Sequence, residues 1–466
     1  MATRNVLIVA YHYPPIRSAG VERTAKFERY LPEFGYRTTI LTTAAFGGRG
    51  DARHLRAWEP LAAYRWLFNR QARERPESST QVRAAAGARG QGVRDFVNRW
   101  LLVPDGQITW VPAGIIKGLR LLRREPVDLI YSTSPPASGH LIALLLAQLT
   151  GLPWVADFRD SWVYDPLDPA LSLDSSRFEL EAWLEAAVVN GADATIAATA
   201  VSADMLRQQH PAARDRISVI TNGFDPQDLD GAVDGPIPES LLFDTETPIE
   251  AAAQQLEVPE RGDGEERPMR VVHTGSFAHS HPNRSPVGLF EALRLLIAED
   301  DGWMGKLQVI LVGRLTRDEL SSAADLIEAG IVVIAGEVDA ASAHRFQSGA
   351  DLLLVVDHDR PWPASNVPGK FYDYLGVGHP IIALCGAGAL SDLMEELGGG
   401  VWVRPDDAAG IARVLGEFHA RFASGTLGEG ECGDLSRFHR RELSGELAAR
   451  FDRAVERRER PFFGDQ

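Results

Sequence analysis

The residues best suited to chemistry lie in one short stretch, SNVPGKFYDYLGVGHP, at positions 365–380. Lys370 and Asp373 are three residues apart, so a helix would carry this cation and this carboxylate on one face. Pro368 suits the first turn of such a helix, and Gly378 suits its end. The stretch follows an apolar run that predicts a buried strand. This pattern favours binding of an anionic ligand, whereas the alternative is an exposed ion pair worth about 0–1 kcal/mol.

Several other polar residues in the second half follow predicted strands, where parallel sheets bind their ligands. Gly275 ends the run MRVVHTG, and Arg314 follows the run LQVILVG, although a plain surface arginine is a comparable interpretation there. Arg284 stands beside the predicted start of a helix, whose amide groups attract phosphate. The candidate anion-binding residues of this half are His273, Gly275, Arg284, Arg314, Asn366, Gly369, Lys370 and Asp373.

The first half offers a second group of candidates, also placed after predicted strands. In VADFRDSW, 155–162, either Asp157 or Asp160 could accept a proton from a hydroxyl group, and a structural Asp–Arg pair is the alternative. His140 lies on the exit loop of the neighbouring strand and joins them as a catalytic candidate. Gly20 precedes a predicted helix, where it would either help to bind the anion or only permit a tight turn.

The sequence predicts no metal site and no cofactor. His273, His279 and His281 match no standard zinc spacing and have no carboxylate partner nearby in the sequence. The DHDRP stretch at 357–361 contains a lone D-x-D, which is too weak a signal to indicate a metal.

Composition indicates a soluble globular chain with more than one domain. The chain has 466 residues, 45% hydrophobic residues and a net charge of −16. Two cysteines, no signal-peptide pattern and the absence of a sufficiently long apolar run lead us to expect a cytoplasmic protein, or one peripheral on the inner face of a membrane. Residues 1–125 hold 21 basic against 10 acidic residues, which indicates either an anionic partner or an arginine-rich solvated surface. We expect no nucleic-acid partner.

Short β-branched runs alternate with amphipathic segments, which predicts an α/β fold with two Rossmann-like, doubly wound domains facing a cleft. The expected organisation is a first domain at 1–225, an acidic Pro/Gly-rich linker or insertion at 226–268, a second domain at 269–430 and a terminal helix at 431–466. The first-domain strands are expected at 5–11, 37–43, 127–133, 153–158, 192–198 and 216–221. The linker is expected to contain one short helix near 248–257.

These stretches together resemble a retaining, family 4-like glycosyltransferase with the GT-B fold. The most specific are TNGFD at 221–225 and VPGKFYDYLGVGHP at 367–380, and the resemblance extends over most of the chain outside about 45–95 and 228–268. It implies a C-terminal domain that binds a nucleotide-diphosphate sugar and an N-terminal domain that binds the acceptor. It also implies front-side attack with retention of configuration, in which the departing phosphate helps to take the acceptor proton and no metal is required.

The family usually has two glutamates in an E-x7-E pattern, and the second contacts the ribose. Asp373 falls at the second position, but Ser365 stands at the first. The resemblance assigns the diphosphate to Lys370, Arg284 and Arg314, with backbone amides around Asn366–Gly369 in support. Many relatives have a histidine where this chain has DFRD, so Asp157 or Asp160 would assume its positioning role.

The acceptor is expected to be a glycan or a lipid-linked sugar, and the expected pathway is surface polysaccharide or glycoconjugate biosynthesis. Residues 53–75 combine four aromatic residues with six arginines, a composition that suits either an interfacial helix on an anionic membrane or core packing with a basic outer face. Two alternatives stay open for the whole chain. One is a non-catalytic protein that binds a nucleotide sugar, and the other is a nucleotide-sugar 2-epimerase.

Overall fold

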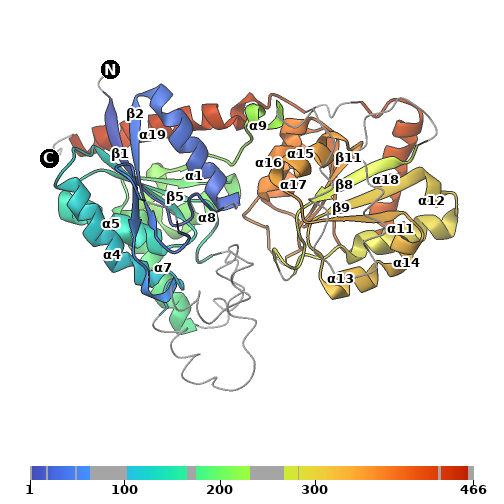
Figure 1. Cartoon of the computed structure of the whole chain (residues 1–466), viewed down its shortest axis with the longest axis horizontal. Coiled ribbons are helices and arrows are strands. Elements are labelled where there is room, and N and C mark those ends of the chain that lie inside the picture. Colours follow the sequence, from blue (N-terminus) through green and yellow to red (C-terminus); the bar gives the residue numbers. More distant parts are fainter. Residues whose placement is uncertain are drawn as a thin grey trace. The chain divides into compact units, whose positions relative to one another are not determined.

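A computed structural model describes residues 3–16, 19–47, 50–62, 102–164, 175–230, 267–281, 283–360, 362–428 and 432–459 (Figure 1). The contacts divide the chain into two units, one of Met1–Asn222 with Arg440–Gln466 and one of Gly223–His439. The helix expected near 248–257 and most of the expected linker lie outside the described residues. Among the described helices, none is both long and apolar enough to cross a bilayer.

The first unit is built on a parallel sheet with the strand order β3-β2-β1-β4-β5-β6-β7. Its strands are β1 (Arg4–Val9), β2 (Tyr36–Thr43), β3 (His54–Ala57), β4 (Leu129–Ser134), β5 (Trp154–Phe158), β6 (Ala194–Ala197) and β7 (Ile217–Val219). Its helices are α1 (Ala19–Tyr30), α4 (Val111–Leu122), α5 (Ser138–Thr150), α7 (Ser175–Gly191), α8 (Ala200–Gln209) and α19 (Arg440–Glu459). Short 3-10 turns occupy Leu31–Phe34, Ile108–Trp110 and Pro211–Arg216.

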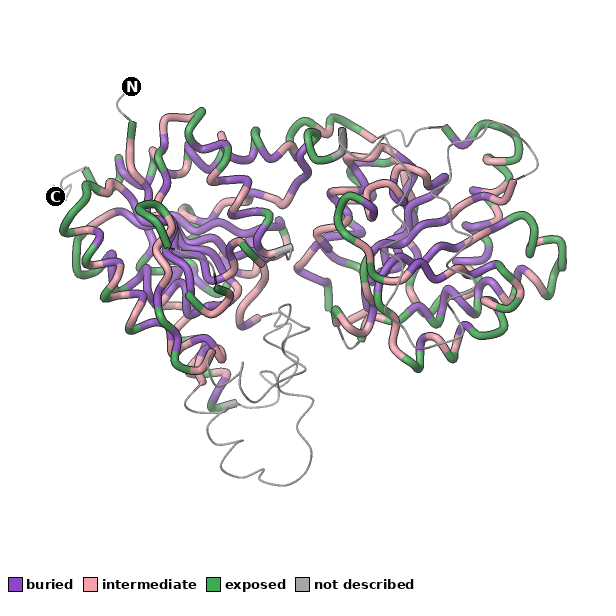
Figure 2. Tube along the Cα trace, viewed as in Figure 1, coloured by how far each residue is buried: buried purple, intermediate pink, exposed green. Residues whose placement is uncertain are grey.

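The strands of this sheet are apolar on both sides because helices cover both faces. Alternate residues of β1 belong to different clusters: Leu7 packs with α4 and α5, and Ile8 packs with α1 and α19. Figure 2 shows the resulting buried centre with exposure confined to the outer helix surfaces. The chain leaves β1 toward β2 on one side and later returns to β4 on the other side, so the carboxyl ends of β1 and β4 flank the point where the strand order reverses.

The second unit repeats this plan with the parallel strand order β10-β9-β8-β11-β12-β13. Its strands are β8 (Met269–Thr274), β9 (Leu307–Val312), β10 (Val332–Gly336), β11 (Leu352–Val356), β12 (Ile381–Leu384) and β13 (Gly400–Val403). Its helices are α9 (Pro226–Asp230), α11 (Val287–Glu299), α12 (Trp303–Lys306), α13 (Arg317–Ser322), α14 (Ala324–Glu328), α15 (Ala340–Ser348), α16 (Gly369–Val377), α17 (Ala389–Leu397) and α18 (Ala408–Ala423), and a 3-10 turn spans Ser436–Phe438. Here the order reverses between β8 and β11. The predicted α/β class with two Rossmann-like units is confirmed.

The first residues of the aromatic, arginine-rich segment 53–75 do not form the interfacial helix that was considered for this segment. His54–Ala57 form the edge strand β3, in register with Ile40–Thr43 of β2. The backbone pairs with β2 at these residues, which excludes a helix there. Residues 63–75 lie outside the described residues.

The terminal helix α19 packs with the first unit, although the second unit precedes it in the sequence. A stripe of apolar residues four apart, Leu443, Leu447, Phe451 and Val455, is buried against the sheet and α1. The ring of Phe451 makes edge contacts with Tyr36 and Tyr131 at centroid distances of 5.2 and 5.7 Å. Figure 1 shows α19 on the same face of the sheet as α1.

Because Phe451 is fully buried in this contact, we expect Phe451→Ala to lower the free energy of unfolding by about 3–5 kcal/mol. Urea unfolding of the full chain measures this loss. Leu149→Ala, at a side chain that is 64% exposed on α5, is the matched control and should change stability by less than about 0.5 kcal/mol. Equal effects of the two substitutions would contradict the assignment of α19 to the core of the first unit.

Candidate functional site

The loops after β8 and β9 in the second unit come into direct backbone contact. The amide of Gly275 donates to the carbonyl oxygen of Val312 across 2.6 Å. A Cβ atom added to Gly313 would lie 2.6 Å from the Gly275 carbonyl, and both glycines have positive φ, so only glycine fits at either position. The loops are thereby held at the carboxyl edge, beside the reversal of strand order.

Lys370, in the first turn of α16, reaches this edge. Its ammonium donates to Nε2 of His273 across 3.2 Å. A Cβ atom on Gly275 would lie 2.7 Å from Nζ of Lys370, so the glycine leaves the space that the lysine occupies. Among the described residues, no carboxylate lies within ion-pair distance of Lys370. An amine held in this way has binding capacity left for an anion.

The basic side chain of Arg284 lies at the same edge and is held by an acid. Its guanidinium contacts Oδ1 of Asp357, the residue after β11, at 2.8 Å. His358 faces the same oxygen from 3.1 Å through Nδ1. Burial raises the pKa of Asp357, but the hydrogen bonds from His358 and Arg284 and their charges outweigh this effect and hold the pKa below its usual value. Arg284 is therefore positioned by a permanent carboxylate.

The remaining candidates of the second unit lie around this edge at different depths. Arg314 follows β9 and is exposed, with its amide donating to Ser276 Oγ at 3.2 Å. Asn366 accepts from Arg360 at 3.0 Å, and Gly369 is the first residue of α16. Asp373, one turn further along α16, is close enough that its charge raises the pKa of Lys370.

Ser365, at the place of the family's first glutamate, is buried, only 2% exposed. The adjacent Ala364 pairs with Gly388 in an isolated parallel bridge, and this contact holds the start of the loop inward. A carboxylate at position 365 would therefore enter the interior, which accounts for the uncharged residue.

The pKa of Lys370 is shifted far from that of an exposed lysine. Burial, helped by the charge of Arg284, lowers it to about 7, against the opposing effect of Asp357 and Asp373. His273 is wholly buried, and its pKa lies well below the ordinary value because of burial and the neighbouring Lys370. The site thus combines a neutral imidazole with an amine that is close to its titration midpoint at neutral pH.

Within the described residues, no group of three or more His, Cys, Asp or Glu side chains is arranged to hold a metal ion. His281 stacks on His358 with ring centroids 4.0 Å apart, and its pKa falls to about 4 through burial and the neighbouring His358, Arg284 and Arg360.

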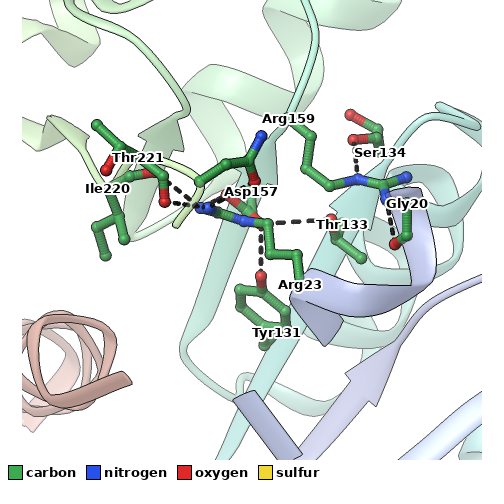
Figure 3. A network of polar contacts seen from close by, with 10 residues as sticks. Gly20, Arg23, Tyr131, Thr133, Ser134, Asp157, Arg159, Ile220 and Thr221 are labelled. Carbon is green, nitrogen blue, oxygen red and sulfur yellow. Dashed lines mark hydrogen bonds and ion pairs between the residues drawn. The ribbon is translucent and has the colours of Figure 1, made fainter. Parts of the chain in front are cut away.

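In the first unit, a fully buried ion pair lies at the carboxyl edge (Figure 3). Arg23 of α1 binds both oxygens of Asp157 of β5 at 2.9 Å, and each side chain is at most 1% exposed. The same guanidinium donates to the carbonyl oxygens of Ile220 and Thr221 at 2.9 and 2.6 Å. The hydroxyl of Tyr131 donates to Asp157 at 2.5 Å.

This network determines the charge state of Asp157. Burial raises the pKa of its carboxyl, but Arg23, the hydrogen bond from Tyr131 and the charge of Arg159 outweigh burial, and the pKa is lowered. An ionised carboxylate occupied by Arg23 on both oxygens is not placed to take a proton from an acceptor. The geometry therefore corresponds to the structural Asp–Arg pair that the sequence left as an alternative, although the acid is paired with Arg23 and not with Arg159.

Arg159, next to this pair, also binds main-chain carbonyl oxygens. Its three nitrogens donate to the carbonyl oxygens of Ser134, Gly20 and Pro135, as Figure 3 shows for the first two. A Cβ atom on Gly20 would lie 2.4 Å from the guanidinium. Gly20 thus lies within the first turn of α1 and admits Arg159, which ties the start of α1 to the end of β4.

His140 is fully buried in the first turn of α5. The hydroxyl of Ser132 accepts from the indole of Trp154 at 2.8 Å and lies 2.8 Å from Nδ1 of His140. Burial lowers the pKa of His140 to about 3, so the imidazole is neutral. A buried side chain fixed in this way does not reach a substrate. Asp160, by contrast, is partly exposed directly after β5 and keeps its place as a candidate.

Two polar atoms at the reversal point of the first unit remain buried without hydrogen-bond partners among the described residues. They are Nδ1 of His12, after β1, and Oγ of Ser134, at the end of β4. His12 stacks on Phe46, and burial together with Arg159 lowers its pKa to about 3. A neutral imidazole and a hydroxyl group are suited to bind sugar hydroxyls.

The sequence interpretation missed Arg23, His12 and Asp357. Asp357 and His12 directly follow predicted strands, so the rule that selected Gly275 and Arg314 could have selected them too. Arg23 had no such signal, because its partner Asp157 is 134 residues away in the sequence.

Comparison with known proteins agrees with this architecture. Residues 19–223 match the family model "Glycosyl transferase 4-like domain". Among solved structures, sucrose-phosphate synthase from Thermosynechococcus elongatus shares 14% identity at a TM-score of 0.53, over 98% of this chain and 97% of that one. HepE from Anabaena, in complex with UDP and glucose, shares 16% at a TM-score of 0.53, over 96% and 99%. A putative UDP-N-acetylglucosamine 2-epimerase from Listeria monocytogenes shares 13% at 0.51, over 99% of both chains.

These structural likenesses show the fold, which is GT-B with two Rossmann-like units. Residues 19–223 of the first unit match the glycosyl transferase 4-like model, so the predicted resemblance is confirmed for this domain and for the GT-B fold. No curated protein matches the chain.

Arg23→Met would leave the carboxylate of Asp157 buried without its partner, so we expect a loss of about 3–5 kcal/mol in the free energy of unfolding. The double variant with Asp157→Asn should lose less, because the stranded charge is gone. Arg207→Met, which removes the pair with the exposed Asp204 and one hydrogen bond to the carbonyl oxygen of Ile217, is the control and should cost about 1–2 kcal/mol. If chemical denaturation gives similar losses for Arg23→Met and Arg207→Met, the buried pair does not have the structural weight assigned to it.

Lys370→Met should leave the ligand-free protein at least as stable as the parent at pH 7. The pKa of Lys370 is about 7 when folded, against 10.5 for an unperturbed lysine, so the unfolded chain binds more protons between these values. The parent therefore gains stability from pH 7 to about 10.5, and the advantage of the variant should shrink over that window. Lys306→Met, at an exposed lysine paired with Asp300, should show no such trend in denaturation curves. A variant less stable than the parent by the same amount at every pH would contradict the shift.

Proposed function

We propose that this protein is a glycosyltransferase that moves a sugar from a nucleotide-diphosphate donor to a hydroxyl group of a glycan or lipid-linked acceptor, with retention of configuration. The observation that carries the proposal is the group of cations at the reversal point of the second unit. Among the described residues, no carboxylate lies within ion-pair distance of Lys370. Arg284 lies in the loop before α11, and Arg314 follows β9. A diphosphate supplies the negative charge that this group lacks.

The first unit supports the acceptor side of the proposal. Nδ1 of His12 and Oγ of Ser134 have no hydrogen-bond partner among the described residues and lie where the strand order of this unit reverses. Ser134 falls within residues 19–223, which match the glycosyl transferase 4-like model, and His12 precedes that stretch. Asp160, partly exposed after β5, is the carboxylate we assign to positioning the acceptor hydroxyl. The same proposal includes a role in surface polysaccharide assembly and docking on an anionic membrane. In the segment 53–75 that would dock, Trp58 follows β3 and is 67% exposed.

In the proposed reaction, the protein acts through position and charge. Lys370 and Arg284 would stabilise the negative charge that builds on the departing diphosphate, and Asp373 would receive the ribose hydroxyls. Because Asp357 and the paired glycines hold these groups in place beforehand, little reorganisation is needed when the bond to the sugar breaks. The departing phosphate would take the acceptor proton on the face from which it leaves, so the configuration of the sugar is retained.

A panel of UDP, GDP, dTDP and ADP sugars tests the proposal by thermal shift and calorimetry, followed by analysis of the products. We expect one nucleotide class to bind and slow release of its diphosphate without acceptor. Lys370→Met should weaken binding at least about tenfold, since charge-assisted hydrogen bonds contribute about 1.5–3 kcal/mol and tenfold corresponds to about 1.4 kcal/mol. Lys306→Met should bind as the parent does.

Three outcomes would contradict the proposed transferase activity. Binding without release of diphosphate, even with glycan acceptors present, would indicate a non-catalytic nucleotide-sugar protein. Conversion of the donor to its 2-epimer would indicate an epimerase, the class to which the Listeria structure is attributed. No binding of any activated sugar would refute the proposal.

A further inference from the structure

His273 is held on every side that the structure describes. It ends β8 with no exposed surface, and its ring stacks on Phe277 with centroids 4.4 Å apart and planes 17° apart. Nδ1 lies 2.8 Å from the carbonyl oxygen of Leu354 on the neighbouring strand β11. The remaining nitrogen, Nε2, faces Lys370. His273 also interacts with the backbone of Gly275, so it contacts the proposed ligand site through that glycine and through the lysine.

The protonation of this imidazole follows from its partners. A carbonyl oxygen can only accept, so Nδ1 of His273 carries the proton that it donates to Leu354. Nε2 is then a lone pair, and the hydrogen bond of 3.2 Å must be donated by Lys370. Burial and the neighbouring cation hold the pKa of His273 well below its ordinary value, so it remains neutral over the working pH range.

The groups that face Lys370 come from each element around it. They are His273 from β8, Arg284 from the loop before α11, Asp357 from the end of β11 and Asp373 from α16 itself. Arg284 and Asp357 neutralise each other in their ion pair. The lysine is left with a neutral hydrogen-bond acceptor on one side and a single carboxylate on its own helix.

We propose that His273 is a positioning residue that holds the amine of Lys370 beside Gly275, and that the diphosphate of a nucleotide sugar binds there together with the uptake of one proton by this lysine. The inference rests on the proposed function and specifies how the anion is received. The proton comes from the solvent and converts the neutral amine to the ammonium, with no other bond changed. The two negative charges of the ligand stabilise the ammonium in a site that burial otherwise makes unfavourable for it.

The test is calorimetry of the full chain with the tightest-binding member of UDP-glucose, GDP-mannose, dTDP-glucose and ADP-glucose, in buffers that differ in ionisation enthalpy. The diphosphate of a nucleotide sugar is esterified at both ends and has no proton that titrates near neutral pH, so any uptake is by the protein. With the pKa of Lys370 at about 7, we expect uptake to approach one proton per site at pH 8 and to fall toward none at pH 6.

Three variants separate positioning from mere structural support. Lys370→Arg keeps a permanent cation, so it should bind the nucleotide sugar without proton uptake. His273→Phe keeps an aromatic ring against Phe277 but removes the lone pair, and it should weaken binding at least tenfold and change the pH dependence of binding. His273→Gln, whose amide oxygen can accept from Lys370, should recover part of that loss. His344→Gln, on α15, is the control and should match the parent.

Binding by the parent without pH-dependent uptake, or equal affinity of His273→Phe and the parent, would overturn the inference and leave the proposed function standing. Uptake that persists in Lys370→Arg would assign the proton to another group and would also overturn it. Failure of all four nucleotide sugars to bind the parent would overturn the proposed function, and the inference with it.

Discussion

Each unit of this protein places a cation at the carboxyl edge of its sheet, and the way in which that charge is balanced decides what the edge can do. In the first unit, Arg23 is neutralised by Asp157, with its other hydrogens on main-chain carbonyls. In the second unit, Lys370 meets a neutral imidazole and, among the described residues, no ion-pair partner. A charge removed from water requires a partner, so the first arrangement is complete within the protein, whereas the second leaves room for the anionic ligand that we propose.

The parallel sheets explain why the two cations occupy equivalent places. Strand order reverses between β1 and β4 in one unit and between β8 and β11 in the other, and loops diverge from that point in opposite directions. Segments that are far apart in the sequence meet at each of these edges. In the first unit, Arg159 joins the start of α1 to the end of β4, and in the second unit Lys370 brings α16 to Gly275. The same topology therefore supplies rigidity in the first unit and an anion site in the second.

Ser365 stands where the family pattern has its first glutamate, and its surroundings are consistent with this assignment of roles to the two edges. The position is buried next to the bridge between Ala364 and Gly388, so a carboxylate there would be costly and would not face a bound sugar. Arg284 and Lys370 lie at this edge together with Asp373, and these are the groups that we propose bind the diphosphate and the ribose. Contacts to the sugar itself are therefore expected from backbone groups at the start of α16.

Periodicity and composition were sufficient to predict the two α/β units, most strands and the helix that carries Lys370 and Asp373, because alternating apolar patterns and Pro/Gly boundaries are local properties of the chain. The rule that ligands bind after parallel strands also selected Gly275 and Arg314, and the predicted start of a helix selected Arg284. Tertiary structure alone showed that Asp157 is the counter-ion of Arg23, that His140 is an interior group, that 54–57 is an edge strand and that α19 joins the first unit. Each of these depends on partners far away in the sequence, and burial and charge pairing are properties of that assembled surrounding, which no local pattern encodes.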